Sequence, residues 1–277
     1  KMKDSRTSSI VLHNLLIAVL AFIWLIPIIW LLCTSFSAYS GMNTSTFFPK
    51  EWSISNYMKL FHSDSVSQFP QWFLNTFIIA CFTCVISTMF VLMVAYATSV
   101  MRFKMRKPLM NMAVILNLFP GMLAMIAVYF TLKSFNLTNS YAGLIMVYSA
   151  SSGLGYLIAK GFFDTVPRAL CEAARIDGAS KPRMFFKITL PMITSIAFFN
   201  IIMQLITALQ NFTSAFVVTN GGPNKGTYVL GMKLYTDAFK YFKMGYACAT
   251  SWILFIVILI MTAVLFATSK KWVYYDN

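Results

Sequence analysis

Six long apolar segments are separated by less apolar ones along the chain. A hydrocarbon layer about 30 Å thick is crossed by about 20 consecutive apolar residues in an α-helix, and every one of these segments is long enough. The segments span residues 11–32, 73–100, 109–132, 141–163, 188–218 and 246–268. The pattern therefore predicts an all-α polytopic membrane protein with six transmembrane helices.

Basic residues are distributed unevenly between the polar segments, and this asymmetry predicts the orientation. If the N-terminus lies in the cytoplasm, the inner segments hold 15 of the 22 Lys and Arg residues. These inner segments are residues 1–10, 101–108, 160–187 and 269–277. Because an excess of Lys and Arg marks the cytoplasmic side of a membrane protein, we expect both termini to be cytoplasmic.

The predicted spans divide the chain into three regions. Residues 1–32 form a cytoplasmic start and the first span, which is longer than the apolar region of about 7–15 residues in a cleaved signal peptide. Residues 33–72 form an outer loop. Residues 73–277 form a core that contains an inner loop at 164–187 and an outer loop at 219–245.

The composition supports the membrane assignment. Hydrophobic residues make up 58% of the chain and charged residues 11%, whereas soluble domains average about 25% charged residues. The net charge of +14 does not indicate nucleic-acid binding, because the basic residues lie in short runs between apolar segments rather than on one face of a soluble domain.

The sequence offers no energy source and no catalytic arrangement. All eight acidic residues lie outside the predicted spans, whereas proton-coupled carriers usually bury carboxylates or histidines. There is no G-x-x-x-x-G-K-[ST] phosphate loop, and we find no nucleophile–base pair, metal-ligand cluster or paired carboxylates within a span. We therefore expect a non-catalytic transporter subunit, without a metal or cofactor of its own, that another subunit drives.

The inner loop contains an unusually polar stretch, CEAARIDGASKPRMFFKITLP, at residues 171–191. Pro167 suits the first turn of a helix, and Gly178 suits the left-handed residue that ends one. A second short helix is expected from Ser180 to the start of the fifth span at Pro191. The stretch thus predicts two short helices joined by a glycine turn.

One face of the first helix suits close contact with another protein. Ala173 and Ala174 leave this face nearly flat, while Glu172, Arg175 and Asp177 add fixed charges. From these residues alone, the loop is either a docking element for a partner protein or an amphipathic connector on the lipid surface.

The loop resembles a known family pattern, E-A-A-x3-G-x9-I-x-L-P. The matching residues are Glu172, Ala173, Ala174, Gly178, Ile188, Leu190 and Pro191. The pattern is that of the cytoplasmic EAA loop in permease subunits of bacterial binding-protein-dependent ABC importers. The resemblance implies that the helix at 167–177 is a coupling helix, which docks in a cleft of an ATPase subunit.

Further stretches are similar to the carbohydrate-uptake branch, the maltose-type permeases. They are FFPKEWSISNYMKLF, QWFLNTFI, TNGGPNKGT and SKKWVYYDN. This resemblance implies one helix before a five-helix core in the bacterial inner membrane. It also implies a second homologous permease, two ATPase subunits that bind ATP and Mg, an extracytoplasmic sugar-binding protein and a sugar substrate.

The fifth predicted span carries polar residues at helical spacing. Asn200, Gln204, Thr207, Asn211 and Ser214 fall on one helical face, and Gln210 lies beside it. Amide and hydroxyl groups there suit the hydroxyl groups of a sugar, but they suit hydrogen bonds between helices equally well. Asn117, close to Pro120 and Gly121, is a further candidate for the substrate pathway, and kinking of the helix is the alternative explanation.

The residues leave the substrate and the energy source partly open. The resemblance to the maltose-type branch favours a sugar, and specifically an oligosaccharide, as the substrate; glycerol phosphate or a polyol is the alternative. The outer lysines Lys225, Lys233, Lys240 and Lys243 would suit an anion, or they form a solvated rim. An ATPase-independent secondary carrier is the alternative from another class, and it would require buried ionisable groups, which the predicted spans lack.

Overall fold

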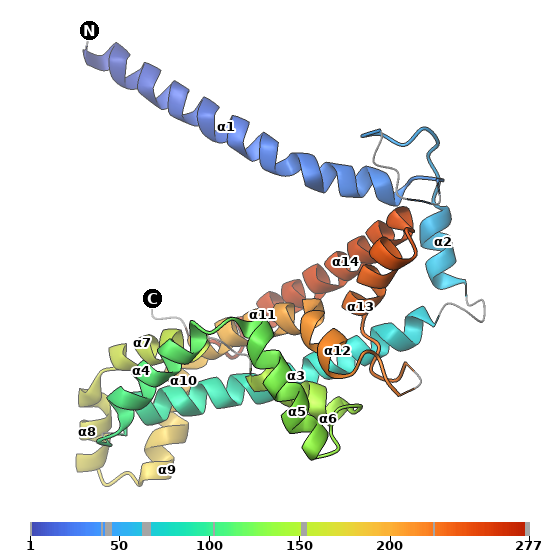
Figure 1. Ribbon diagram of the computed structural model, residues 1–277. Helices are drawn as coiled ribbons and strands as arrows, with labels where there is room; N and C mark the ends of the chain where they lie inside the picture. The colour runs from blue at the N-terminus through green and yellow to red at the C-terminus, as the bar shows by residue number, and fades with distance from the viewer. Residues whose placement is uncertain are drawn as a thin grey trace. The chain divides into compact units, whose positions relative to one another are not determined.

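The computed structural model describes residues 2–39, 41, 46–62, 68–101, 103–150, 154–223 and 225–274. Within these ranges, residues 2–9, Met122 and Arg168 are described by their backbone alone. Its regular secondary structure is helical, apart from an antiparallel β-bridge between Ser37 and Trp52. The longer helices are α1 (Met2–Ser35), α3 (Phe69–Ser99), α11 (Thr194–Gln210) and α14 (Met244–Ser269) (Figure 1).

Shorter helices fill the rest of the chain. In order they are α2 (Ser55–Phe61), α4 (Arg106–Asn117), α5 (Gly121–Ser134), α6 (Tyr141–Ala150), α7 (Gly155–Thr165), α8 (Arg168–Ile176), α9 (Lys181–Met184), α10 (Leu190–Met192), α12 (Thr213–Val218) and α13 (Leu230–Tyr235). Two stretches form π-helices, η1 (Phe185–Thr189) and η2 (Thr236–Lys240).

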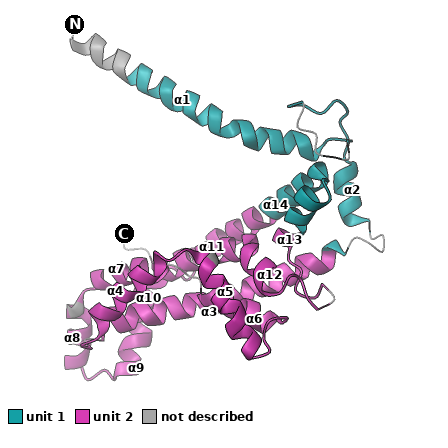
Figure 2. Ribbon diagram, in the orientation of Figure 1, with its two compact units in different colours: residues 1–69, 233–255 teal, residues 70–232, 256–277 magenta. Residues whose placement is uncertain are grey.

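The chain forms two compact units, which Figure 2 colours separately: residues 1–69 with 233–255, and residues 70–232 with 256–277. In the first unit, Asn56 fixes the segment after α1, because its Nδ2 donates to the carbonyls of Ser35 at 3.1 Å and Ser37 at 2.9 Å. Gly245 permits this packing, since a Cβ there would lie 2.8 Å from Asn56 Nδ2.

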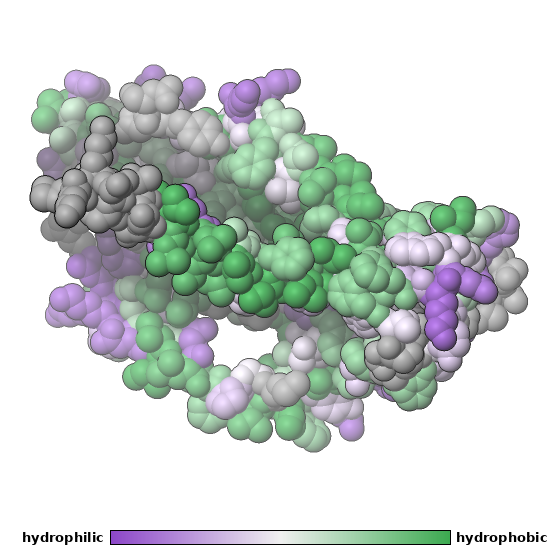
Figure 3. Space-filling view, turned by 90° about the horizontal axis from the view of Figure 1, so that it is seen from above, coloured by the Kyte–Doolittle hydropathy of each residue, from purple (hydrophilic) through white to green (hydrophobic). Residues whose placement is uncertain are grey.

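The helices provide three to five candidate spans. Ile10–Ser35, Phe69–Ser99 and Met244–Ser269 are each long and apolar enough to cross a membrane, and the pairs α6–α7 and α9–α11 qualify if each pair is one span. Apolar side chains cover most of the face seen in Figure 3, as expected for a surface that meets lipid. The structure thus confirms an all-α membrane protein, while the predicted count of six is not confirmed.

The expectation of one continuous helix over residues 109–132 is wrong. The chain forms α4 and α5 instead, with a break over Leu118–Pro120. Pro120 has no N–H to donate to a preceding turn, and its φ of −57° and ψ of 118° lie outside the helical region. The break falls where Pro120 and Gly121 indicated a kink.

A buried apolar cluster joins three helices of the second unit. Val91 and Ala95 of α3 meet Ala159 and Phe163 of α7, together with Ile193 and Ile196 at the start of α11. We call this group the α3–α7–α11 cluster. The cluster connects segments that are far apart in the sequence. Of these, α7 precedes the polar loop predicted at residues 164–187, and α11 follows it.

Candidate functional site

The polar loop predicted at residues 164–187 contains α8 and α9, separated by a glycine turn. Gly178 has a φ of +78°, and its N–H donates to the Arg175 carbonyl at 3.1 Å while Ala179 N–H donates to the Ala174 carbonyl at 2.9 Å. These two bonds form a Schellman motif, which requires a left-handed residue after the helix. The predicted glycine stop is confirmed.

The second helix of the loop is longer than the sequence indicated. Pro182 occupies the first turn of α9, but the chain stays helical through η1 and α10 and passes Pro191 without ending. It bends by 62° before α11, at Ile193. Prolines and π-helices are the usual causes of such a bend. The expectation that the second short helix ends at Pro191 is therefore wrong.

The predicted coupling residues lie on the surface. Glu172, Ala173, Arg175, Asp177 and Gly178 are exposed, and Ala174 is half-buried. Among the residues that the structure describes, no ion pair engages Glu172, Arg175 or Asp177. The charged groups of α8 are therefore available to a partner.

Two apolar side chains of α8 also face outward. Ile176 is 87% exposed and Leu170 is 46% exposed. Apolar side chains at such positions, beside charged ones, indicate a surface that another molecule covers. The sequence pattern did not single out either residue, although Ile176 lies inside the EAA pattern and Leu170 lies two residues before it.

Aromatic packing fixes both flanks of the loop to α3. Tyr96 of α3 packs edge-on against Phe163 of α7, with ring centroids 6.1 Å apart. The same ring meets Phe185 of η1 at 5.4 Å. Together with the α3–α7–α11 cluster, these contacts join the segments before and after the loop into one body.

A polar contact reinforces this attachment. Ser99 Oγ, at the end of α3, donates to Asp164 Oδ1 at 2.5 Å. Lys160 pairs with the other carboxylate oxygen of Asp164 at 2.5 Å. The last turn of α3 and the last turn of α7 therefore lie together beside the loop.

The polar stripe of the fifth span does not follow a single helical face. Asn200, Gln204 and Thr207 lie on α11, but this helix ends at Gln210. Asn211 has an extended backbone, with a φ of −67° and a ψ of 121°, and Ser214 belongs to α12. The prediction of one continuous face is wrong because the helix stops before its last two members.

The members of the stripe differ in environment. Asn200 is only 3% exposed, and a Cβ on Gly155 of α7 would lie 3.4 Å from its Oδ1, so this side chain packs between helices. Gln204 is half-buried, whereas Thr207 and Gln210 are exposed.

Asn211 and Ser214 are tied to each other. Asn211 Oδ1 accepts from Ser214 N–H at 3.4 Å, and the Asn211 carbonyl accepts from Tyr148 Oη at 3.2 Å. Asn211 itself is half-buried, and Ser214 is buried.

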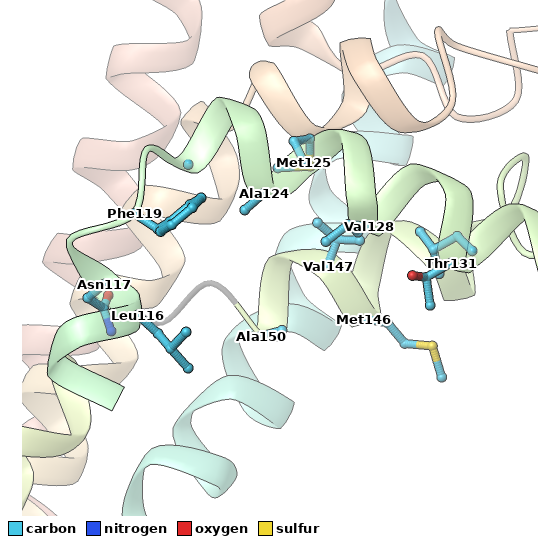
Figure 4. A pocket seen from close by; sticks show the side chains of 12 residues that line it. Leu116, Asn117, Phe119, Ala124, Met125, Val128, Thr131, Met146, Val147 and Ala150 are labelled. Carbon is cyan, nitrogen blue, oxygen red and sulfur yellow. The ribbon is translucent and has the colours of Figure 1, made fainter. Parts of the chain in front are cut away.

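Asn117 lines an open apolar cavity of about 640 Å³. Figure 4 shows Leu116, Asn117 and Phe119 on one side and side chains of α5 and α6 on the other. Asn117 Nδ2 donates to the Ala113 carbonyl of its own helix at 2.9 Å. The lining is mostly apolar, so this cavity suits a hydrocarbon chain or an apolar helix better than a sugar.

Within the described ranges, no three His, Cys, Asp or Glu side chains gather as metal ligands. In the fourth predicted span, Ser149 of α6 is buried, and Tyr156 of α7 packs against the α3–α7–α11 cluster.

The comparison with known families decides the class of the protein. The family described as "Binding-protein-dependent transport system inner membrane component" matches residues 92–272, most of the chain. The chain belongs to this family. It is accordingly a permease component, a class that is not catalytic and carries no cofactor.

Relatives with similar sequences are ABC permeases, several of them for carbohydrates. The probable ABC transporter permease YesP of Bacillus subtilis is 40% identical over 144 residues, which are 51% of this chain and 47% of YesP. The galactooligosaccharide permease GanQ of the same organism is 33% identical over 192 residues, 69% of this chain and 68% of GanQ. The chain of the present protein therefore spans about half of the length of YesP and about two thirds of the length of GanQ.

A solved structure shares the fold. The crystal structure of a bacterial ABC transporter involved in the import of the acidic polysaccharide alginate matches with a TM-score of 0.71, at 18% identity, over 96% of each chain. At this identity the likeness concerns the fold alone, and it supports the all-α polytopic architecture.

Proposed function

We propose that this permease is a transmembrane subunit of an ATP-driven importer for a sugar, and that α8 with its glycine turn docks on an ATPase subunit. A second homologous permease, two ATPase subunits and an extracytoplasmic sugar-binding protein complete the assembly. The observation that carries the proposal is the exposed α8 surface, in which Ile176 and unpaired charges project from a loop whose flanks are fixed to α3.

The attachment of the loop explains how an external force reaches the membrane helices. A push on α8 passes into α7 and η1, and both meet α3 through Tyr96 and the α3–α7–α11 cluster. Close-packed interiors transmit displacement because they have low compressibility. Closure of the two ATPases would thus rock α3, α7 and α11 together and open the pathway on the other side.

Contacts at the ends of the helices support the proposed topology. Ser99 meets Asp164, so an even number of crossings must separate them if both lie at one membrane face. The α6–α7 pair supplies one crossing, and we propose that α4 and α5 together supply the other. This restores six spans in total.

The C-terminal segment supports the same side for the terminus and the loop. Tyr274 N–H donates to Thr194 Oγ1 at 2.8 Å, and Trp272 packs edge-on against Phe198 with centroids 5.7 Å apart. The C-terminal segment therefore lies at the end of α11 that leads back to α9. With the excess of Lys and Arg in these segments, we infer that the loop and both termini are cytoplasmic.

The outer lysines favour a neutral substrate over an anionic one. Lys233 pairs with Asp237 at 2.6 Å and lies 4.7 Å from the Tyr246 ring centroid. Lys225 lies 5.7 Å from the Trp72 ring centroid. Two of the four candidate lysines are thus engaged within the protein. The galactooligosaccharide permease and the maltodextrin permease MdxG, 32% identical over 167 residues, support an oligosaccharide as the substrate.

The test is sugar-dependent ATP hydrolysis by the reconstituted complex. The tagged permease would be purified with the ATPase that binds it, placed in lipid nanodiscs with the second permease and binding protein, and supplied with galactotriose, maltotriose or glycerol 3-phosphate. We expect a neutral trisaccharide to stimulate hydrolysis. Stimulation by glycerol 3-phosphate alone would assign an anionic substrate, and uptake into liposomes without any ATPase would refute the importer assignment.

A further inference from the structure

A second cavity, of about 330 Å³, lies between α5 and α12 and includes the turn that leads from α5 to α6. Helix α12 packs against both α5 and α6, and the three helices are side by side in Figure 1. Five of the side chains that line the cavity bear polar groups and belong to Tyr129, Thr138, Asn139, Thr219 and Asn220. They come from two stretches that are distant in the sequence, and only the fold brings them together.

The hydroxyl of Thr219 donates to the Ala215 carbonyl at 3.0 Å. The other four polar side chains, those of Tyr129, Thr138, Asn139 and Asn220, have no hydrogen-bond partner among the residues that the structure describes. Two of these residues are held in place: Asn220 N–H donates to the Ala215 carbonyl at 3.0 Å, and the Asn139 side chain lies against Gly222, where a Cβ would be 3.1 Å from Asn139 Oδ1. Positioned amide and hydroxyl groups with open hydrogen-bonding capacity are typical of a ligand site.

The lining indicates the chemistry of the ligand. Phe216 and Tyr129 supply aromatic surface, and the amides of Asn139 and Asn220 each offer donors and an acceptor. None of the eight lining residues is charged. A ring with an apolar face and several hydroxyl groups fits this combination, whereas an anion would find no cationic partner.

Two larger cavities lack this character. The cavity beside Asn117 is mostly apolar, and a third, of about 370 Å³, is lined by apolar and aromatic side chains such as Met89, Met93 and Phe185. Ligand pockets usually measure about 300–1,000 Å³, and the cavity at α12, of about 330 Å³, lies at the lower end of this range. It therefore has room for the terminal unit of an oligosaccharide rather than for the whole oligosaccharide.

We propose that the cavity formed by Tyr129, Thr138, Asn139, Phe216 and Asn220 is an outer subsite that receives the terminal sugar of a neutral oligosaccharide. The proposal rests on the proposed function, including its orientation, which places the end of α5 and the end of α12 on the outer face. The subsite is close to the predicted pathway in sequence, since α12 begins two residues after Asn211.

Site-directed labelling tests the proposal in the full complex in nanodiscs. Thr138→Cys introduces a thiol of similar size into the cavity, and a charged, membrane-impermeant maleimide measures its accessibility above the labelling of the parent protein. Maltotriose and galactotriose are the probes, and mannitol at the same osmolarity is the additive control. At a probe concentration about ten times its Kd, we expect the labelling rate to fall about tenfold.

Two further variants make the result specific. The first variant adds Tyr129→Leu and Asn220→Gly to Thr138→Cys. It removes a ring, a hydroxyl and an amide, while glycine keeps the left-handed backbone at residue 220, whose φ is +46°. In this variant, sugar should no longer protect the thiol from labelling. Lys240→Cys, at an exposed position of the first unit, should label at the same rate with and without sugar.

The outcomes separate the subsite from the function. If a trisaccharide stimulates ATP hydrolysis but leaves labelling at Thr138→Cys unchanged, or if protection survives the removal of Tyr129 and Asn220, the subsite is overturned and the importer assignment stands. If no trisaccharide stimulates hydrolysis in the parent complex, the proposed function fails first.

Discussion

The glycine turn after α8 provides the sharpest test of the coupling role. Gly178 holds a φ of +78°, and a Cβ built there meets no atom within 4 Å. Replacement by Ala therefore introduces no clash, and its cost arises from the left-handed backbone alone, roughly 1–2 kcal/mol for a residue with a Cβ. A free-energy change of this size corresponds to a factor of about 5–30 in an equilibrium.

The expected result is weaker docking rather than loss of the fold. If the Schellman motif must be intact for α8 to dock, Gly178→Ala raises the Kd of the permease pair for its ATPase subunit by about 5–30-fold. Gly178→Asn should lose less, because Asn tolerates the left-handed region better than other residues. The Kd would be measured by biolayer interferometry on nanodisc-held permeases, with ATP hydrolysis as a second readout.

A matched control lies one helix earlier. Gly161 sits inside α7, and a Cβ there also meets no atom within 4 Å, but its backbone is helical. Gly161→Ala should leave the Kd unchanged, since Ala is preferred over Gly in a helix by about 1 kcal/mol. Equal Kd values for Gly178→Ala and the parent would refute the reasoning, and an equal loss in Gly161→Ala would show that the effect is not specific to the turn.

Three other predictions concern single side chains. Ile176→Ser should change the free energy of unfolding by less than about 0.5 kcal/mol, because the residue is 87% exposed, yet weaken ATPase binding in the same interferometry assay; unchanged binding would exclude Ile176 from the interface. Phe163→Ala should lower the free energy of unfolding by about 3–5 kcal/mol, since it removes a buried ring from the α3–α7–α11 cluster. The thermal midpoint in detergent measures this loss. Leu170→Ala is the control, because its exposed side chain should contribute little to the midpoint. In the first unit, burial raises the pKa of Asp237 above 3.8, although Lys233 opposes the shift. The ionised carboxylate therefore lowers the stability of the fold above the folded pKa, and this loss disappears as the pH falls through that pKa. As the pH is lowered from neutral to 4, the thermal midpoint of the parent should rise relative to that of Asp237→Asn. A fall of the parent's midpoint relative to the variant's would contradict the assigned direction.

The amino-acid sequence alone determined the class of the protein and the position of the glycine turn after α8. Apolar segments of more than 20 residues are stable as helices in lipid because their backbone hydrogen bonds are satisfied internally, and this is a property of local sequence. The glycine stop at Gly178 was predictable for a similar reason, since few other residues accept its backbone conformation.

Only the tertiary structure decided which polar residues are accessible. Helical spacing placed Asn200 and Asn211 on one face, but α11 ends between them, and Gly155 of α7 lies against Asn200. Tyr129 and Asn220 gave no common signal in the sequence, because they are brought together by the packing of α12 on α5. Periodicity shows which side chains share a face of a helix, whereas burial depends on which helix meets that face and where the chain bends.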